Sequence, residues 1–241
     1  MNNNRMSVIA LLCLVLFPST ALHAAAANDC HLKQYSSLDL LELPNGRLLV
    51  PVKIDDSDAF MILNTNSGFS GVTDNAVVRL ALPYKPIPSR VEVGFGGAPV
   101  KWVATATGFS LGDLQFRGAD FMVIPNNVIG DHPDEVRVIG ILGLDMLAHV
   151  DVELDVANRK MNLFSQDHCP GNTVYWSSTY DSMPVRVGKL GELYFPMELD
   201  GKKIETTLAT GNITTMLFSD VAKTIYKLDR HSNDVEAGPD D

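Results

Sequence analysis

Short apolar runs separated by Gly, Pro, Asn and Asp dominate the chain. Many of these runs alternate apolar and polar residues, and most are rich in β-branched or aromatic side chains, which is typical of β-strands. Two segments, 75–81 and 144–149, predict short helices, whereas 36–43 is ambiguous. The pattern predicts a mainly β protein whose strands include residues 48–54, 59–63, 91–95, 100–107, 121–124 and 150–154.

Acidic residues alternate with apolar ones in the last of these strands, at Asp151 and Glu153, and Asp155 follows it. Alternation in a strand places every second side chain on the same face. We therefore interpret the three carboxylates as a solvated strand face rather than a metal or acid–base site.

An internal repeat is visible when the sequence is shifted by 145 residues. Residues 49–82 then align with 194–227 without a gap, and Pro51, Asp55 and Thr65 fall on Pro196, Asp200 and Thr210. Few positions are identical, so coincidence is the alternative. The predicted strand, turn and second strand nevertheless occur at equivalent positions in both segments, which favours an architecture of two similar lobes.

The first 26 residues have the pattern of a cleavable signal peptide, with Arg5 before an apolar stretch at 8–17 and small residues at 24–26. About ten apolar residues are too few for a helix that spans a bilayer, which needs roughly 20. The expectation is a secreted or periplasmic protein without a stable membrane anchor after cleavage; a retained anchor is the alternative.

The formal net charge is -10, and removal of Arg5 with the signal peptide makes it more negative by one. No basic patch with interleaved aromatic residues is visible, so a nucleic-acid partner is disfavoured. The six histidines are scattered and no clustered Cys/His spacing occurs, so no metal site is predicted, and no motif indicates a cofactor.

Cys13 would leave with the signal peptide, which leaves Cys30 and Cys169 as a pair in an oxidising compartment. We predict that they form a disulfide. Two buried free thiols are the alternative.

The segment 60–68, Phe-Met-Ile-Leu-Asn-Thr-Asn-Ser-Gly, resembles the hydrophobic-hydrophobic-Asp-Thr-Gly-Ser turn of retropepsin-like aspartic peptidases, including their two-lobed bacterial relatives. Residues 205–212 resemble a second copy. The glycine-rich stretch 91–100 resembles the flap hairpin that closes over substrate in this family, with Gly94, Phe95, Gly96 and Gly97 near its tip. The motif Ile141-Leu142-Gly143 resembles the family's closing apolar-apolar-Gly segment, which packs beside the catalytic turn.

The resemblance fails at the residues that perform the chemistry. Asn64 and Ala209 occupy the positions of the two catalytic aspartates, and that mechanism needs two carboxylates, one as base and one as acid. Asn66 replaces the first glycine of the signature, although asparagine tolerates positive φ better than most residues.

Other parts of the turns are kept. Thr65 and Thr210 retain the hydroxyls that in the family join the two turns, and Gly211 keeps the second Thr-Gly pair. Asp145 is expected to stabilise the start of a helix rather than to serve as a spare acid. No other nucleophile is indicated, because Ser70 lies in Gly-Phe-Ser-Gly, which is one residue short of a nucleophile elbow.

The resemblance implies a retropepsin-like β-barrel lobe with short helices, followed by an incomplete second lobe, since 32 residues follow Ala209. The implied function is that of an inactive peptidase-like protein that binds an extended peptide or protein segment beneath the flap. The alternatives are an active endopeptidase completed by homodimerisation or by an unidentified acid, and a non-functional truncated product. The predicted boundaries are 1–26 signal peptide, 27–42 lead-in, 43–167 lobe one, 168–183 linker, 184–228 partial lobe two and 229–241 polar tail.

Overall fold

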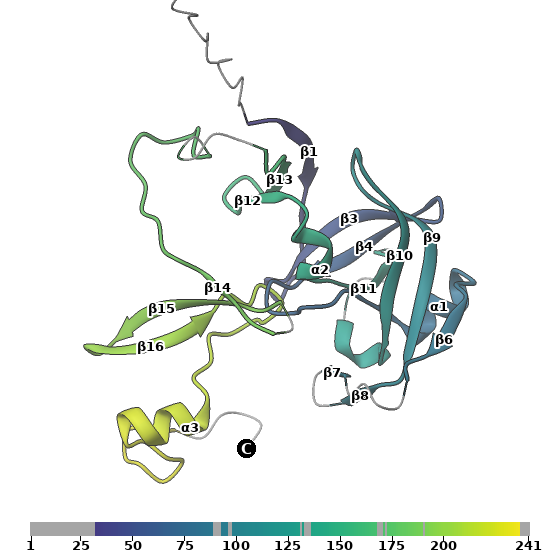
Figure 1. The fold of residues 1–241 in the computed structure, drawn as a ribbon. Coiled ribbons are helices and arrows are strands. Elements are labelled where there is room, and N and C mark those ends of the chain that lie inside the picture. The colour runs from purple at the N-terminus through teal and green to yellow at the C-terminus, as the bar shows by residue number, and fades with distance from the viewer. Residues whose placement is uncertain are drawn as a thin grey trace, which may run out of the picture. The chain divides into compact units, whose positions relative to one another are not determined.

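The computed structural model describes residues 32–88, 93–95, 98–130, 132, 136–167, 171, 173–189 and 191–236, all of them within the unit His31–Asp241. The predicted signal peptide, Cys30, Cys169, Gly96 and Gly97 lie outside the described residues, so the predicted disulfide and the tip of the flap stay predictions. The described chain is mainly β with a few short helices (Figure 1), which confirms the predicted fold class.

Six strands of lobe one close into a barrel. Each is hydrogen-bonded to the next, and a pairing of the first with the last closes the ring. β4 and β11 are parallel, as are β5 and β10, and the remaining neighbours are antiparallel. In their order around the barrel the strands are β3 (Leu48–Ile54), β4 (Ser57–Leu63), β11 (Val138–Leu142), β5 (Gly71–Thr73), β10 (Leu114–Ile124) and β9 (Trp102–Leu111).

Two shorter strands, β2 (Leu41–Glu42) and β6 (Tyr84–Pro86), extend the sheet beside β3 and β9. Every residue of β11 is buried, because this strand lies between β4 and β5 in the middle of the sheet. Inside the barrel Phe109 and Phe121 meet edge to face with their ring centroids 5.2 Å apart, the arrangement that aromatic pairs prefer. Burial on one face of β3 and β9 explains why the apolar alternation in the sequence predicted strands there.

A second sheet joins β1 (Gln34–Asp39), β13 (Lys160–Phe164) and β12 (Asp151–Asp155) in that order. β1 and β2 lie in the segment that the sequence left ambiguous. On β12 the acidic residues Asp151, Glu153 and Asp155 are all partly exposed, and Glu153 accepts hydrogen bonds from Asn162 Nδ2 at 2.9 Å and Tyr175 Oη at 2.6 Å. Tyr175 also meets Phe164 at 5.7 Å between ring centroids, so this side chain of the linker packs over the edge of the sheet.

Two of the helices fall where the sequence predicted them. α1 (Asp74–Arg79) begins after Thr73, whose hydroxyl accepts a hydrogen bond from Ala76 N, a standard N-terminal cap. α2 (Leu144–Leu147) follows Gly143 directly, and a 3₁₀ helix, η1, spans Asn126–Ile129. In the part of the chain that the structure describes, no helix is long and apolar enough to cross a membrane.

Partial lobe two consists of a three-stranded sheet and a short helical segment. The strands are β14 (Arg186–Val187), β15 (Leu193–Leu199) and β16 (Lys202–Thr207), and the helical segment is α3 (Ser219–Val221) continued by a π-helix, η2 (Ala222–Tyr226). Figure 1 shows β15 and β16 as a hairpin with α3 later in the chain. Among the described residues after 183, only Gly211 is buried, so this part of the chain has no core of its own.

The two lobes repeat each other at the level of strand register. Leu49 pairs with Ile62 across β3 and β4, and the residues 145 positions later, Tyr194 and Thr207, pair across β15 and β16. The same shift converts the β2–β3 register into the β14–β15 register and the first residue of α1 into the first residue of α3. The structural repeat therefore begins earlier than the sequence alignment indicated, at β2 and β14.

The connections between these strands are repeated as well. Gly46 and Gly191 both have positive φ, at 85° and 93°, where glycine is favoured. The amide of Gly46 donates to the carbonyl of Leu43, and Gly191 donates to the carbonyl of Gly188 in the corresponding turn. The matching registers, turn hydrogen bonds and positive φ values show that the described residues between 186 and 212 repeat the fold of 41–67.

Candidate functional site: two matched turns

The first turn follows the buried end of β4. Asn64 N donates to Leu142 O at 2.9 Å, which fixes the turn to β11. Ser67 N donates to Asn64 O at 3.2 Å, and Asn66 N donates to Asn64 Oδ1 at 3.1 Å. The side chain of Asn64 thus stabilises its own turn by the local hydrogen bond that Asn and Asp commonly make.

The second turn follows β16 and has the same backbone hydrogen bond. Asn212 N donates to Ala209 O at 3.1 Å, at positions 145 residues beyond Ser67 and Asn64. Ala209 has no polar side chain, so the bond from residue 66 to the side chain of residue 64 has no equivalent here. The second turn therefore has the backbone hydrogen bond of the first but lacks a polar side chain at its central position.

Two threonines join the turns by four hydrogen bonds. Thr65 N donates to Thr210 Oγ1 at 3.1 Å, and Thr210 N donates to Thr65 Oγ1 at 3.2 Å. Thr65 Oγ1 donates to Leu208 O at 2.5 Å, and Thr210 Oγ1 donates to Leu63 O at 2.9 Å. Each hydroxyl therefore accepts one bond and donates one, and the arrangement is symmetric between the two copies.

Asn64 also lies directly against Gly211. A β-carbon built on Gly211 would be 2.6 Å from Cγ of Asn64, so position 211 has room only for glycine while Asn64 keeps this position. The floor between the turns is consequently formed by an amide group and a glycine Cα. An amide offers hydrogen bonds but no titratable proton near neutral pH, so this arrangement can bind a polar group and cannot act as a general acid or base.

Ser70 and Asp145 connect the first turn to α2, a contact that the sequence analysis missed. Ser70 Oγ donates to Asp145 Oδ1 at 2.6 Å, and Ser70 N donates to Asp145 Oδ2 at 3.0 Å. Gly143 N donates to Ser70 Oγ at 2.9 Å, and Met146 N donates to Asp145 Oδ1 at 2.9 Å. Asp145 stands in the first turn of its helix as expected, and both of its oxygens are engaged in holding the signature segment.

The Ile141-Leu142-Gly143 motif lies beside the first turn. Ile141 and Leu142 pair with Ile62 and Leu63 of β4 in parallel register. A β-carbon on Gly143 would be 2.5 Å from the carbonyl oxygen of Phe69, so the two backbone segments pass too closely for any other residue. The motif therefore positions the turn by backbone contact as well as by side-chain packing.

The glycine-rich stretch forms a short hairpin of β7 (Val93–Phe95) and β8 (Ala98–Val100). Gly94 is exposed, whereas Phe95 is partly buried and packs against an apolar cluster that includes Ile62 and Ile124. Ile62 is two residues before Asn64. Through Phe95 the hairpin packs on a cluster to which the strand leading into the first turn also contributes.

A mostly apolar cavity of ≈ 770 Å³ is lined in part by Thr65. Its lining comes from lobe one, the linker and partial lobe two, and includes Leu63, Leu144, Leu193 and Leu208. None of the described residues of the β7–β8 hairpin lines this cavity.

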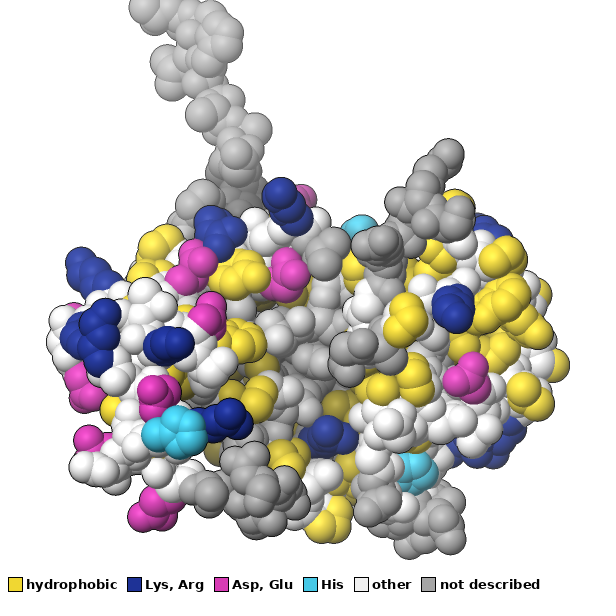
Figure 2. All heavy atoms as spheres, turned by 90° about the horizontal axis from the view of Figure 1, so that it is seen from below, with side chains coloured by type: hydrophobic (Ala, Val, Ile, Leu, Met, Phe, Trp, Pro, Cys, Tyr) yellow, Lys and Arg dark blue, Asp and Glu magenta, His cyan; other side chains and the backbone are white. Residues whose placement is uncertain are grey.

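The charged groups near the surface show no concentration of one sign on the face drawn in Figure 2, where basic and acidic side chains are interspersed. Among the described residues, no group of three or more His, Cys, Asp or Glu side chains is placed so that it could hold a metal ion.

A scan against protein-family models found no match, and a search of curated proteins found none. Among solved structures, the chain is similar to a retropepsin-like aspartic protease from Rickettsia conorii, with 12% sequence identity and a TM-score of 0.38. The similarity covers 56% of this chain and 95% of that protein.

Proposed function

We propose that the chain is a secreted or periplasmic, catalytically inactive protein of the retropepsin-like type that binds an extended peptide beneath the β7–β8 hairpin. The observation that carries the proposal is that the two turns are joined by hydrogen bonds although neither has a carboxylate at its centre. The four bonds of Thr65 and Thr210 join the turns, while Asn64 and Ala209 stand at their centres.

The absence of catalysis follows from the chemistry of these side chains. Activation of a water and protonation of a leaving amine need a base and an acid, and each such contribution is worth about 10²–10⁴-fold in rate. Asn64 and Ala209 supply neither. Asp145 does not replace them, because its two oxygens accept hydrogen bonds from Ser70 and from the amide of Met146 in its own helix.

Peptide binding is supported by the β7–β8 hairpin. Its Gly94 is exposed and its Phe95 is partly exposed, whereas the cluster that Phe95 packs against, which contains Ile62 and Ile124, is buried. Extended peptides are commonly recognised through backbone hydrogen bonds to a strand, with side chains in adjacent apolar pockets. The Asn64 amide, which can both donate and accept, would add a polar contact to a peptide carbonyl or amide.

The test is calorimetric titration with a set of extended, uncharged hexapeptides, with the same samples followed by mass spectrometry for cleavage. We expect saturable binding without cleavage, and weaker binding by Phe95→Ala. Val78→Ala is the matched control, because Val78 is an exposed apolar residue of α1 remote in sequence from the hairpin. Binding that is unaffected by Phe95→Ala would contradict the assignment of the site, and cleavage would contradict the inactive state.

The proposed location has a separate test. Expression in a host with a secretory pathway should give an exported protein whose N-terminus lies near residue 27, as determined by sequencing. An exported or cell-associated protein that retains residues 1–26 would contradict cleavage.

A further inference from the structure

The amide side chain of Asn64 has one end that the fold uses and one end that it leaves available. Its Oδ1 accepts a hydrogen bond from Asn66 N at 3.1 Å. This bond identifies the oxygen end of the amide, because a backbone N–H needs an acceptor. Asn64 is partly exposed, and its Nδ2 has no hydrogen-bond partner among the residues that the structure describes. The side chain therefore offers a hydrogen-bond donor.

The other side chains at the contact between the turns offer no such donor. Thr65 Oγ1 and Thr210 Oγ1 each donate one hydrogen bond and accept one. Ser67 Oγ donates to a backbone carbonyl of its own turn at 2.6 Å, and Ala209 has no polar group. A hydroxyl has a single proton to donate, so these three hydroxyls are committed to the fold. Asn64 Nδ2 is the donor that remains for a ligand.

This donor is held in a fixed place. Asn64 N donates to Leu142 O at 2.9 Å, which fixes the backbone on the side of lobe one. On the side of partial lobe two, a β-carbon built on Gly211 would be only 2.6 Å from Asn64 Cγ, so the glycine backbone lies directly against the amide. A group that is already held in position loses little conformational entropy when it binds, which favours affinity.

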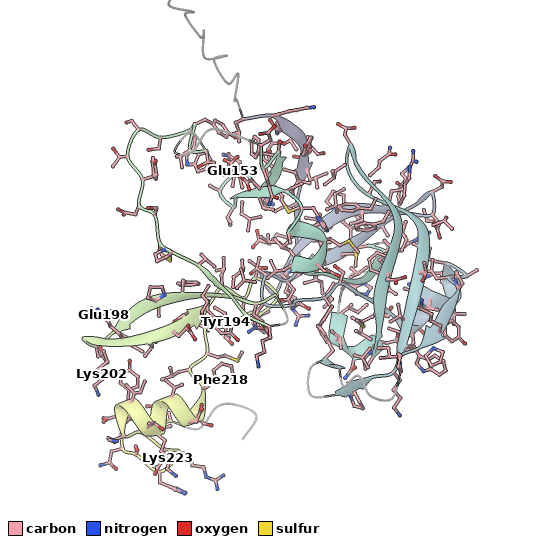
Figure 3. The ribbon with its side chains drawn as sticks, viewed as in Figure 1. Glu153, Tyr194, Glu198, Lys202, Phe218 and Lys223 are labelled. Carbon is pink, nitrogen blue, oxygen red and sulfur yellow. The ribbon has the colours of Figure 1, made fainter. Side chains whose placement is uncertain are left out.

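Both turns lie in parts of the chain without charged side chains. Residues 59–73 and 206–219 contain no Asp, Glu, Lys, Arg or His. Figure 3 shows Glu198 and Lys202 at the far end of the β15–β16 hairpin, whereas the second turn follows the opposite end of β16. A ligand carboxylate would find no cation in these two segments, and an unpaired charge is costly to remove from water. A neutral acceptor therefore suits this donor better than an anionic one.

We propose that Asn64 determines which peptide is bound, by donating a hydrogen bond from Nδ2 to one backbone carbonyl oxygen of that peptide. The inference rests on the proposed function, because it concerns the same extended peptide. It assigns to Asn64 the role of a specificity-determining residue that requires an acceptor at one point of the ligand. Neither the amide nor the carbonyl titrates near neutral pH, so the natural chain should bind with the same affinity at pH 7 and at pH 4.

The first test is Asn64→Asp, which has nearly the same shape. A carboxylate oxygen can still accept the bond from Asn66 N, so the turn keeps its local hydrogen bond. At pH 7 the carboxylate has no proton to donate, and it faces the peptide carbonyl as a second acceptor. Calorimetry with the uncharged hexapeptides that bind the natural chain should show binding that is weaker by about tenfold or more. Asn75→Asp, the same change at an exposed residue of α1, should leave binding unchanged.

The pH dependence of the variant distinguishes a lost donor from a damaged turn. A protonated carboxyl group is again a donor, and an ordinary Asp side chain is about half protonated near pH 4. The ratio of the two affinities, natural chain over Asn64→Asp, should therefore fall from about tenfold or more at pH 7 to about twofold at pH 4. Asp145, the carboxylate that is hydrogen-bonded to Ser70, is present in both proteins, so its titration does not alter this ratio.

Two measurements on the natural chain need no stable variant. The Nδ2 protons of Asn64 should exchange rapidly with water in the free chain and more slowly when a hexapeptide is bound, as followed by nuclear magnetic resonance. In the second measurement, each carbonyl of the hexapeptide is replaced in turn by a thioamide, whose sulfur is a weaker acceptor. One replacement should weaken binding to the natural chain and leave binding to Asn64→Asp at pH 7 unchanged, which identifies the partner of Nδ2.

Three results would overturn the proposal and leave the proposed function standing. The first is equal binding by Asn64→Asp and the natural chain at pH 7. The second is an affinity ratio that is the same at pH 4 as at pH 7, which would give Asn64 a structural role only. The third is slow exchange of the Nδ2 protons in the free chain, which would show that another part of the chain occupies this donor. If the natural chain binds none of the hexapeptides, the proposed function fails and this inference fails with it.

Discussion

The most informative perturbation is Thr65→Val, which removes one hydroxyl and keeps the shape of the side chain. Thr65 is buried, and its Oγ1 donates to Leu208 O at 2.5 Å and accepts from Thr210 N at 3.2 Å. The substitution therefore breaks two of the four bonds that join the turns. It leaves a backbone carbonyl and a backbone amide of the second turn without their partners.

The magnitude can be estimated from these two bonds. A typical hydrogen bond contributes about 0.5–1.5 kcal/mol net, and a buried group left without a partner costs about 1–3 kcal/mol. We expect a loss of about 2 kcal/mol in the free energy that holds the two turns together. Partial lobe two has only Gly211 buried among its described residues, so few other contacts oppose the loss.

The assay is hydrogen exchange at the level of single amides, with Thr224→Val as the control because Thr224 is an exposed threonine of the η2 helix outside the network. The amide of Thr210 should exchange about 30-fold faster in Thr65→Val, which is what 2 kcal/mol predicts when opening is at equilibrium. The amides of β9 and β10 should keep their protection, since the barrel does not depend on this contact. Thr224→Val should change neither.

The double variant Thr65→Val/Thr210→Val distinguishes local loosening of one turn from separation of the two turns. If the turns separate in each single variant, the loss of free energy in the double variant should be smaller than the sum of the losses in the two single variants, because the remaining bonds are already lost. Unchanged protection of Thr210 in Thr65→Val would refute the view that the threonines hold the turns together.

Three further variants test contacts that position the first turn and the linker. Gly140→Ala should destabilise the chain by about 3 kcal/mol in urea unfolding, because its β-carbon would be 1.9 Å from Gly71 O. The control Gly108→Ala, which has open space around it, should change the free energy of unfolding by less than about 0.5 kcal/mol. Equal effects of the two substitutions would contradict the packing argument. Ser70→Ala should cost about 2–3 kcal/mol because Gly143 N and Asp145 lose their partner, and wild-type stability in the same assay would refute that role. The hydrogen bond to Glu153 raises the pKa of Tyr175 from 10.0 to about 12, so this bond stabilises the fold fully below pH 10 and the contribution is lost as the pH rises toward 12. Absorbance titration of Tyr175→Phe should lack a tyrosinate step near pH 12, and loss of a step near pH 10 would show that the bond is absent in solution.

The sequence predicted β3, β4 and parts of β9 and β10, where apolar and polar residues alternate. It did not predict β5 or β11 as strands, because every residue of these two is buried and no two-residue period results. It predicted α1 and α2 because each of these short helices directly follows residues that are typical of a turn. β1 was not predicted, since Gln34 and Ser36 alternate weakly and their partner strand β13 lies more than 120 residues later in the chain. Pairing over that distance leaves no local pattern.

The candidate site was predicted only where local sequence determines it. The motifs identified Asn64, Ala209 and the two threonines by type and spacing, because a tight turn restricts which residues can occupy it. The link from Ser70 to Asp145 joins residues 75 apart, and both are ordinary turn or helix-start residues by sequence. The hydrogen bonds that Glu153 of β12 accepts from Asn162 and from Tyr175 of the linker were not predicted either, because they join residues 9 and 22 positions apart.

The central proposal is that this chain has paired turns that resemble those of aspartic peptidases but lacks the two catalytic carboxylates. The most direct test is turnover of a library of unstructured peptides by the purified chain between pH 3 and pH 7, with and without pepstatin, beside Asn64→Asp and Asn64→Asp/Ala209→Asp. The account predicts no turnover by the natural chain, and none by the Asn64→Asp monomer, because Ala209 offers no second acid. Activity of Asn64→Asp that rises with protein concentration would show that lobe one pairs with itself. Pepstatin-sensitive cleavage by the natural chain would contradict the account, because it would require a carboxylate pair other than positions 64 and 209.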